Sequence, residues 1–288
     1  MRLDMPDLLR LDALFDLTRG SDLPLPSELS RLYGRLQFPI PAERAFVYGN
    51  FVSSVDGVVS LGEPGVSGGG NISGFNKQDA MVMGILRALA DVVIVGAGTL
   101  RESLDHIWTA EFIFPSLANE YQDLRTTLGK SKTPLNVIVS SSGSVDLSLP
   151  VFQSGLVACL IVTTIEGEQR LRTQSLPIST RIAAVKHSGS IGASEILKAV
   201  REVQPGKMIL LEGGPILMGD FFAEQALDEL FLTFSPQIAG RDKSVERPGL
   251  ISGKLFAPEN PLWGTLVSVK RGGSHLFLRY AFETKGEG

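Results

Sequence analysis

The sequence has few of the residues that build disulfides and metal sites. It contains one cysteine, Cys159, so an intramolecular disulfide is impossible. This thiol lies in the apolar run Leu156–Thr163 and is expected to be a buried core residue. The three histidines, His106, His187 and His275, are scattered and lack metal-ligand spacing. The sequence therefore predicts no metal centre, and a single cysteine excludes a zinc deaminase site.

Long apolar runs and blocks of one charge are absent as well. No run reaches the roughly 18 apolar residues that a transmembrane helix needs. Met1–Arg10 carries charges where a signal peptide would be apolar. The net charge is −4, with acidic and basic residues mixed along the chain, so no basic surface for nucleic acid or anionic membrane is expected. These features predict a cytoplasmic protein that binds neither nucleic acid nor a membrane.

Residues 1–44 differ from the rest and are expected to form an N-terminal helical extension and linker. Leu8, Leu11 and Phe15 recur at helical spacing, as do leucines 29, 32 and 36. Between the two sets lies the proline-containing segment Ser21–Pro26, which breaks regular structure. We predict two short helices that pack on the main body, residues 45–288, or on a partner chain.

From Ala45 onward, apolar runs alternate with amphipathic segments, as in an α/β fold. Runs rich in Val, Ile, Leu and Met are typical of strands covered on both faces. The expected strands are Ala45–Val52, Asp91–Gly96, Leu135–Ser140, Leu156–Thr163, Arg181–Val185, Lys207–Glu212, Glu229–Ser235, Leu262–Lys270 and Leu276–Phe282. The expected helices are Phe75–Ala90, Ser116–Leu128, Ala193–Val203 and Pro215–Glu224.

Two details of this pattern define the sheet and its clearest helix. Arg271–Ser274 joins the last two strands without a helix, so the mostly parallel sheet becomes mixed through a C-terminal antiparallel hairpin. In the helix Phe75–Ala90 the inward positions follow 4-3-4-3 spacing, with Asp79 as their one polar member. Ser73 is its expected N-cap.

Two glycine-rich segments connect a buried strand to a helix. The first corner, Val95–Arg101, contains Gly96-Ala97-Gly98-Thr99, and Thr99 is expected to cap a short helix there. The second corner, Leu211–Pro215, places Gly213 and Gly214 before a proline suited to a first helical position. Exposed backbone N–H groups at such helix starts suit a phosphate, although each segment could also be a tight turn without a ligand.

Other polar residues lie where ligands bind in open α/β sheets. Ser54 and Asp56 follow the first strand of the main body, and Ser140 follows the strand from Leu135. Arg87 lies in the last turn of the clearest helix, where a cation either suits the helix dipole or anchors a substrate phosphate. Glu212 ends a buried strand, where a carboxylate needs water or a polar ligand.

Taken in order, these segments resemble the reductase domain that bacterial riboflavin-biosynthesis enzymes carry at the C-terminus. The resemblance spans about residues 45–283. The matching blocks are Ser54–Gly57, Leu86–Ala88, Ala90–Thr99, Glu212–Pro215, Leu227–Leu230 and Pro236–Gly240. The resemblance implies a dihydrofolate-reductase-like α/β fold, NADPH as hydride donor and a homodimer.

The resemblance also implies roles for individual residues. Arg87 matches a contact to the substrate phosphate, Glu212 a contact near its ribosyl part, and Ser54 and Asn71 further substrate contacts. Asp56 or Glu212 would relay the proton. The glycines of both corners would hold the cofactor phosphates, and Ser140 its 2′-phosphate region. The implied cofactor-binding positions are Ser73, Gly96, Ala97, Gly98, Thr99, Ser140, Gly213, Gly214 and Pro215.

Two departures from the family pattern leave the substrate open. Val58 stands where the family has a Lys or Arg after Asp-Gly, and the aromatic-rich segment Arg101–Pro115 replaces an Asp-Asp-Pro and a later Arg. The leading hypothesis is a reductase of a phosphorylated heterocycle, similar to 5-amino-6-(5-phosphoribosylamino)uracil reductase. The alternatives are a reductase of a dihydrofolate-type pterin and a non-catalytic NADPH-binding protein of the same fold.

Overall fold

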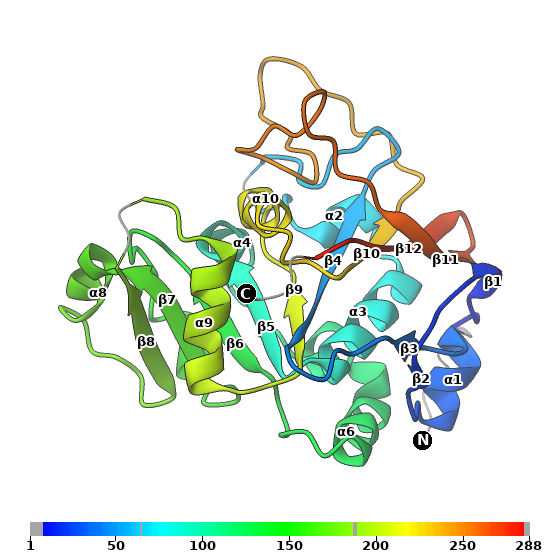
Figure 1. The fold of residues 1–288 in the computed structure, drawn as a ribbon, viewed down its shortest axis with the longest axis horizontal. Coiled ribbons are helices and arrows are strands. Elements are labelled where there is room, and N and C mark those ends of the chain that lie inside the picture. Colours follow the sequence, from blue (N-terminus) through cyan, green and yellow to red (C-terminus); the bar gives the residue numbers. More distant parts are fainter. Residues whose placement is uncertain (1–7, 64, 187–188, 285–288) are drawn as a thin grey trace.

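The computed structural model describes residues 8–63, 65–186 and 189–284 and consists of one large sheet with helices on both faces (Figure 1). The ten strands of this sheet follow the order β1-β11-β12-β10-β4-β9-β5-β6-β7-β8. Residues 1–7 of the predicted extension and His187 lie outside the described residues. The predicted α/β fold with a mixed, mostly parallel sheet is confirmed.

Most neighbouring strands are parallel, as the helices between them require. The parallel strands are β10 (Glu229–Phe234), β4 (Phe46–Ser53), β9 (Met208–Leu211), β5 (Val92–Gly96), β6 (Leu135–Val139), β7 (Cys159–Thr164) and β8 (Thr180–Val185). Antiparallel strands β12 (His275–Ala281) and β11 (Thr265–Gly272) form the predicted hairpin beside β10. All nine predicted strands are present, and no strand end is shifted by more than three residues.

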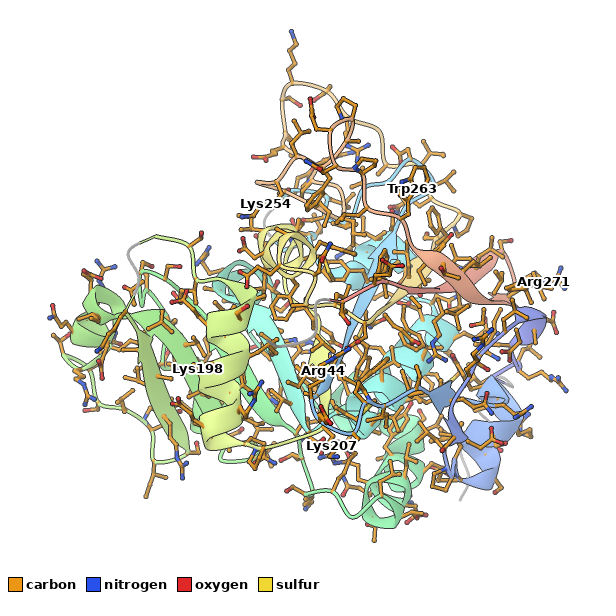
Figure 2. All side chains as sticks on the ribbon, in the orientation of Figure 1. Arg44, Lys198, Lys207, Lys254, Trp263 and Arg271 are labelled. Atoms are coloured by element: carbon orange, nitrogen blue, oxygen red, sulfur yellow. The ribbon has the colours of Figure 1, made fainter. Side chains whose placement is uncertain are left out.

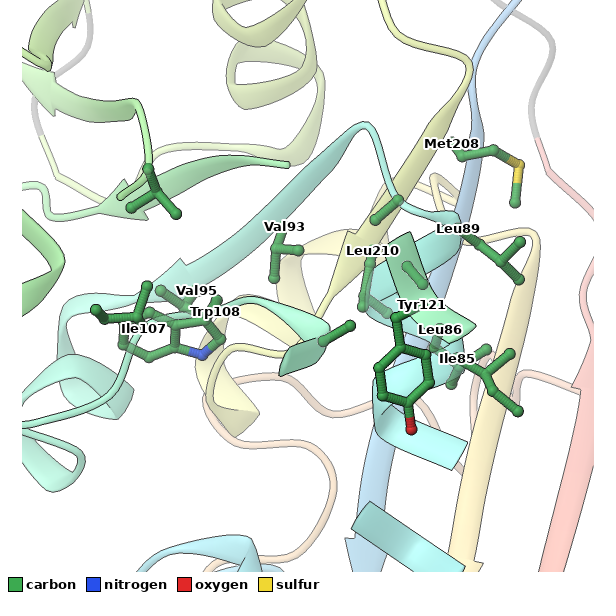
Figure 3. Close-up of a cluster of buried hydrophobic side chains, with 14 of the residues drawn as sticks. Ile85, Leu86, Leu89, Val93, Val95, Ile107, Trp108, Tyr121, Met208 and Leu210 are labelled. Carbon is green, nitrogen blue, oxygen red and sulfur yellow. The ribbon is translucent and has the colours of Figure 1, made fainter. Parts of the chain in front are cut away.

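Helices cover both faces of the sheet because successive strand residues point to opposite sides. Val93 and Val95 pack on the side of α1, α3 and α6, whereas Val92 and Ile94 pack on the side of α9 and α10. Figure 3 shows Val93 and Val95 in the first of these clusters, with Trp108 nearby. The helices are α1 (Ser27–Tyr33), α2 (Gly69–Ser73), α3 (Lys77–Leu89), α4 (Ala97–Glu102), α5 (Ala110–Ile113), α6 (Ala118–Thr127), α7 (Pro150–Gln153), α8 (Ile165–Leu171), α9 (Ala193–Val203) and α10 (Pro215–Ala223).

The start of α3 differs from the prediction. Asn76 is its N-cap, and its side chain accepts a hydrogen bond from the Asp79 N–H at 2.9 Å. Ser73 is instead the last residue of α2, so its predicted capping role is wrong. Phe75 lies before the helix with a φ of 54° and a 76% exposed side chain. The apolar spacing extended the predicted helix over Phe75, which contributes nothing to the core.

The N-terminal extension contains one of the two predicted helices. Leu29 and Leu32 of α1 are buried, as predicted. The helix predicted from Leu8, Leu11 and Phe15 is wrong, because Asp12–Asp16 forms β1 and pairs antiparallel with β11. The open edge of the C-terminal hairpin supplies the backbone partners that a lone amphipathic pattern does not reveal. Short strands β2 (Ser21–Asp22) and β3 (Gln37–Phe38) complete the extension.

A buried arginine joins the extension to the sheet. Arg279 of β12 is 2% exposed and donates from Nε to Glu229 at 2.5 Å and from Nη2 to the Gln37 carbonyl at 2.6 Å. Its guanidinium also lies over the ring of Phe38, 4.4 Å from the centroid. The extension is therefore part of the folded core.

Two further features concern burial. Cys159 is buried as predicted, and burial raises the pKa of its thiol to about 12. In the part of the chain that the structure describes, no helix is both long enough and apolar enough to cross a bilayer.

The packing of α1 predicts a large difference between two leucines of the extension. Leu29 is fully buried, whereas Leu14 of β1 is 55% exposed. We expect Leu29→Ala to lower the free energy of unfolding by about 2–5 kcal/mol, and Leu14→Ala by less than about 1 kcal/mol. Urea denaturation measures both. Equal, small effects would show that the extension does not pack as described.

Candidate functional site

The two glycine-rich corners lie side by side at the carboxyl edge of the sheet. They follow the adjacent parallel strands β5 and β9. A Cβ atom added to Gly213 would lie 2.4 Å from the Gly96 nitrogen and 2.6 Å from the Val95 Cα. Backbone atoms cannot yield as a flexible side chain can, so only glycine fits at position 213.

A hydrogen bond joins the corners directly. The Gly214 N–H donates to Thr99 Oγ1 at 2.9 Å. The expected capping role of Thr99 is wrong, because Gly96 is the N-cap of α4 and Thr99 lies within that helix. Pro215 is the first residue of α10, as predicted. Two helices thus begin next to each other, with Thr99 fixing their separation.

The paired corners have the properties of a phosphate-binding site. A Cβ on Gly96 would meet nothing within 4 Å, and one on Gly98 would meet only Arg101 Nη2 at 4.0 Å. The first-turn N–H groups of α4 and α10, which have no carbonyl partner within their own helices, and the positive dipole ends of both helices lie at the same edge. The residues present therefore fit the diphosphate of a dinucleotide.

Two further turns extend this edge on either side. The turn after β4 contains Ser54 and Asp56, and the turn after β6 begins with Ser140. Since β4, β9, β5 and β6 are consecutive neighbours, their four carboxyl ends form one row. Ser140 is buried, and its carbonyl accepts a hydrogen bond from Thr163 Oγ1 at 2.7 Å. The predicted residues of all four segments thus lie along a single edge.

Asp56 acts as a structural acceptor in the turn after β4. Its carboxylate accepts hydrogen bonds from Ser54 Oγ at 2.6 Å, the Ala239 N–H at 3.1 Å and the Gly240 N–H at 2.7 Å. The Ser54 hydrogen bond, followed by that from Ala239, lowers the pKa of Asp56 to about 2. A group ionised at neutral pH cannot donate a proton, which does not favour the predicted proton-relay role of Asp56.

Val58 is a core residue. It is fully buried and packs with Val52 and Ile72, while its N–H donates to Ser54 Oγ at 2.9 Å. A lysine or arginine in the same backbone position would have no room for its charge there. The departure of Val58 from the family pattern is therefore built into the packing of this turn.

Arg87 and Glu212, both predicted to contact substrate, form a buried ion pair with each other. Arg87 donates from Nη2 and Nε to the Glu212 carboxylate, with a shortest distance of 2.7 Å, and from Nη1 to the Thr109 carbonyl at 3.2 Å. Their side chains are 2% and 6% exposed. Each charge compensates the other in a dry environment. An anionic ligand would have to compete with Glu212 for Arg87.

Asn71 and Ser73, the remaining predicted residues, belong to α2 beside the turn after β4. The Asn71 carbonyl accepts a hydrogen bond from Gln237 Nε2 at 3.1 Å. Ser73 is buried, and its carbonyl lies 2.9 Å from the Nε2 atom of His275. The α2 helix is thus fixed to β12 and to the loop after β10.

A buried carboxyl group near α2 was missed as a site residue. Asp79 of α3 has side-chain hydrogen bonds with Thr233 and Ser73 and lies near His275. Burial raises the pKa of Asp79 above its ordinary value, although these hydrogen bonds oppose the shift. The available signal was an acidic residue at an inward-facing position of an otherwise apolar helix stripe.

The aromatic-rich segment 101–115 packs beneath the sheet. Trp108 is 2% exposed and belongs to the core on the α3 side. The His106 ring lies between Trp108 and Phe112, with centroids 5.0 and 4.6 Å away. Burial, followed by the positive charge of Arg87, lowers the pKa of His106 to about 2. His106 is therefore neutral at physiological pH.

A cavity of about 630 Å³ lies at the opposite, amino edge of the sheet. It is lined by residues before β4 and β9 and by α9, and contains none of the predicted site residues. Figure 2 labels Arg44, Lys198 and Lys207 on this side of the molecule. Within residues 8–63, 65–186 and 189–284, no cluster of three or more His, Cys, Asp or Glu side chains could hold a metal ion.

Comparison with known proteins places this geometry in a family. The family model described as RibD C-terminal domain matches residues 45–274. A 2,5-diamino-6-ribosylamino-4(3H)-pyrimidinone 5′-phosphate reductase from Archaeoglobus fulgidus is 24% identical over 74% of this chain and 89% of its own. The riboflavin biosynthesis protein RibD of Aquifex aeolicus is 24% identical over 62% of this chain. The matched part spans 44% of the length of that relative.

A solved structure has the same fold. The pyrimidine reductase-like protein from Corynebacterium diphtheriae superposes with a TM-score of 0.66 at 21% identity, over 90% of this chain and all of its own. This likeness covers the N-terminal extension in part as well as the main body, since 90% of the chain is more than the 244 residues of 45–288.

The contact between the corners predicts unequal effects of two glycine substitutions. Gly213→Ala places a methyl group against the backbone of the first corner and should lower the free energy of unfolding by about 3 kcal/mol. Gly98→Ala meets no close atom and should change it by less than about 1 kcal/mol. Thermal or urea unfolding measures both values. A stable Gly213→Ala protein would contradict the close approach of the corners.

The neutral His106 predicts a dependence of stability on pH. Its pKa is lower in the folded protein, at about 2, than the ordinary 6.5, so the unfolded chain binds the proton. The contribution of His106 to the free energy of unfolding is fully present above pH 6.5. Below that pH the free energy of unfolding falls by up to about 1.4 kcal/mol per pH unit. His106→Phe keeps the ring stack and should lose less stability between pH 6 and 4. Parallel pH curves for the two proteins would contradict a neutral His106.

Proposed function

The chain belongs to the RibD C-terminal domain family, and we propose that it is an NADPH-dependent reductase of a phosphorylated ribosylaminopyrimidine, acting in the cytoplasm as a homodimer. The relative from Archaeoglobus fulgidus is named for reduction of such a compound. Cofactor preference, location and assembly follow the family resemblance.

One observation carries the proposal. The Gly214 N–H to Thr99 Oγ1 hydrogen bond, 2.9 Å long, holds two helix starts at one place on the edge of the sheet. Backbone N–H groups from both corners can then bind one diphosphate, as a dinucleotide requires. The family match covers both corners, which are more than a hundred residues apart.

The cofactor would lie along the row of carboxyl ends. Gly96, Ala97, Gly98 and Thr99 with Gly213, Gly214 and Pro215 would hold its phosphates, and Ser140 would contact the 2′-phosphate region on the β6 side. Bound there, NADPH supplies the hydride. Because β4 and β10 lie on the other side of β9, the nicotinamide end would lie near Ser54, Asn71 and Ser73.

The protein would mainly align donor and acceptor and hold the proton. Arg87 and Glu212 are proposed substrate contacts from the α3 side, and substrate entry would redistribute their mutual hydrogen bonds. Of the two carboxylates predicted to relay the proton, Asp56 is fixed by Ser54 and two backbone N–H groups. Glu212 remains the proposed one, and it would act once substrate entry releases it from Arg87. Asp79 is a further proton-holding group, because burial raises its pKa.

Substrate-dependent oxidation of NADPH tests this function. The purified protein is mixed with NADPH and one of three compounds. These are the 5′-phosphate of 2,5-diamino-6-ribosylamino-4(3H)-pyrimidinone, 5-amino-6-(5-phosphoribosylamino)uracil, and dihydrofolate. We expect loss of NADPH absorbance with at least one pyrimidine and none with dihydrofolate. Turnover of dihydrofolate alone would overturn the substrate class, and NADPH binding without any turnover would support a non-catalytic protein.

Thr99→Val provides a matched variant for the cofactor site. Valine has the shape of threonine but cannot accept the Gly214 hydrogen bond. We expect the KM for NADPH to rise about tenfold, with a smaller change in the KM for the pyrimidine. Thr18→Val, which removes a hydroxyl bonded to Asp16 and Gln37 in the extension, should leave both constants unchanged.

A further inference from the structure

One buried hydrogen-bond acceptor at the carboxyl edge has no partner. The Oε1 atom of Gln237 is buried and accepts no hydrogen bond from the described residues. A buried amide oxygen left unpaired costs about 1–3 kcal/mol. Gln237 lies beside the turn after β4 and α2, where the proposed function places the substrate, so a donor from that substrate would satisfy this acceptor.

The other end of the same amide determines which atom is the acceptor. Gln237 Nε2 lies 3.1 Å from the carbonyl oxygen of Asn71. A carbonyl oxygen only accepts hydrogen bonds, so the atom facing it must be the NH2 group. The opposite atom is therefore the carbonyl oxygen, and its missing partner must be an N–H or O–H donor.

The backbone around Gln237 holds this acceptor in place. The Gln237 carbonyl accepts the Val55 N–H at 2.9 Å, and its own N–H lies 3.3 Å from Ser235 Oγ. Asp56 binds the N–H groups of Ala239 and Gly240 in the same loop. The turn after β4, α2 and the loop after β10 are thus joined around Gln237 by backbone and side-chain hydrogen bonds, so the acceptor is preorganised.

The position of Gln237 distinguishes it from the other buried polar atoms without a partner among the described residues. These are His106 Nε2, Thr180 Oγ1 and Arg279 Nη1. Thr180 lies in the edge strand β8, and Arg279 lies beneath the N-terminal extension. His106 lies under the sheet with Trp108. Gln237 alone of the four contacts segments that carry the predicted substrate residues Ser54 and Asn71.

We propose that Gln237 is a specificity-determining residue whose Oε1 accepts a hydrogen bond from a ring N–H group of the pyrimidine. This inference rests on the proposed function, because it places the heterocycle near β4 and β10. An N–H donor is also present in the carboxamide of a nicotinamide, so binding of the two molecules must be measured separately. A substrate lacking the ring N–H would leave Oε1 unpaired and should bind weakly.

The matched variants are Gln237→Met and Gln153→Met. Methionine has similar length and no amide, and Gln153 also donates from Nε2 to a backbone carbonyl, that of Leu147, but in α7 away from the site. With the best pyrimidine substrate, Gln237→Met should raise KM at least tenfold, with the Kd for NADPH unchanged. Gln153→Met should change neither constant. Thermal unfolding of both variants checks that they remain folded.

Probe binding separates this inference from the proposed function. The probes are 5,6-diaminouracil and 5,6-diamino-1,3-dimethyluracil, which lacks both ring N–H groups, measured by calorimetry with saturating NADP⁺. Wild-type protein should bind the first at least tenfold more tightly, and Gln237→Met should bind both equally. Equal discrimination between the two probes by wild type and variant would overturn the inference. A variant that binds only NADPH more weakly would also overturn it, because Oε1 would then bind the cofactor.

The two failures are distinguishable. Absence of turnover by the wild-type protein with every pyrimidine would defeat the proposed function, whatever the probes do. Retained discrimination by Gln237→Met in an active enzyme would defeat the role of Gln237 while leaving the reductase intact. If neither protein distinguishes the probes, the inference is wrong, and a buried water molecule would be the donor to Oε1.

Discussion

The site depends on the contact between two strand-to-helix corners. Gly213 can approach Val95 and Gly96 this closely only because it has no side chain, and the Thr99 hydroxyl then links the first corner to Gly214. Parallel pairing of β5 with β9 brings the corners to the same edge. Two helix starts in one place bring N–H donors from both corners to the same diphosphate.

Much of the fold follows from patterns that have one physical explanation. Unbroken Val, Ile and Leu runs predict buried parallel strands, and Gly-rich segments after them predict the corners. The pattern failed where two structures explain it equally well. Leu8, Leu11 and Phe15 fit a helix, but β11 offers an open edge that makes Asp12–Asp16 a strand. Which answer is right depends on a partner more than two hundred residues away.

The side chains of the site were harder to predict than their positions. Arg87 and Glu212 were each predicted to contact substrate, whereas their pairing with each other depends on a 2.7 Å approach that sequence spacing cannot give. The hydrogen bonds that lower the pKa of Asp56 come from a loop far along the chain. Asp79 and Gln237 have chemical meaning only through burial, which makes an ordinary carboxyl or amide group exceptional.

Hydrogen exchange at the two corners tests the central claim most directly. Amide exchange is followed by NMR or mass spectrometry with and without NADPH, for peptides covering residues 96–101 and 212–218. If the corners bind one dinucleotide together, NADPH slows exchange in both segments with the same concentration dependence. Protection of one segment alone, or of neither while NADPH binds, would contradict the account.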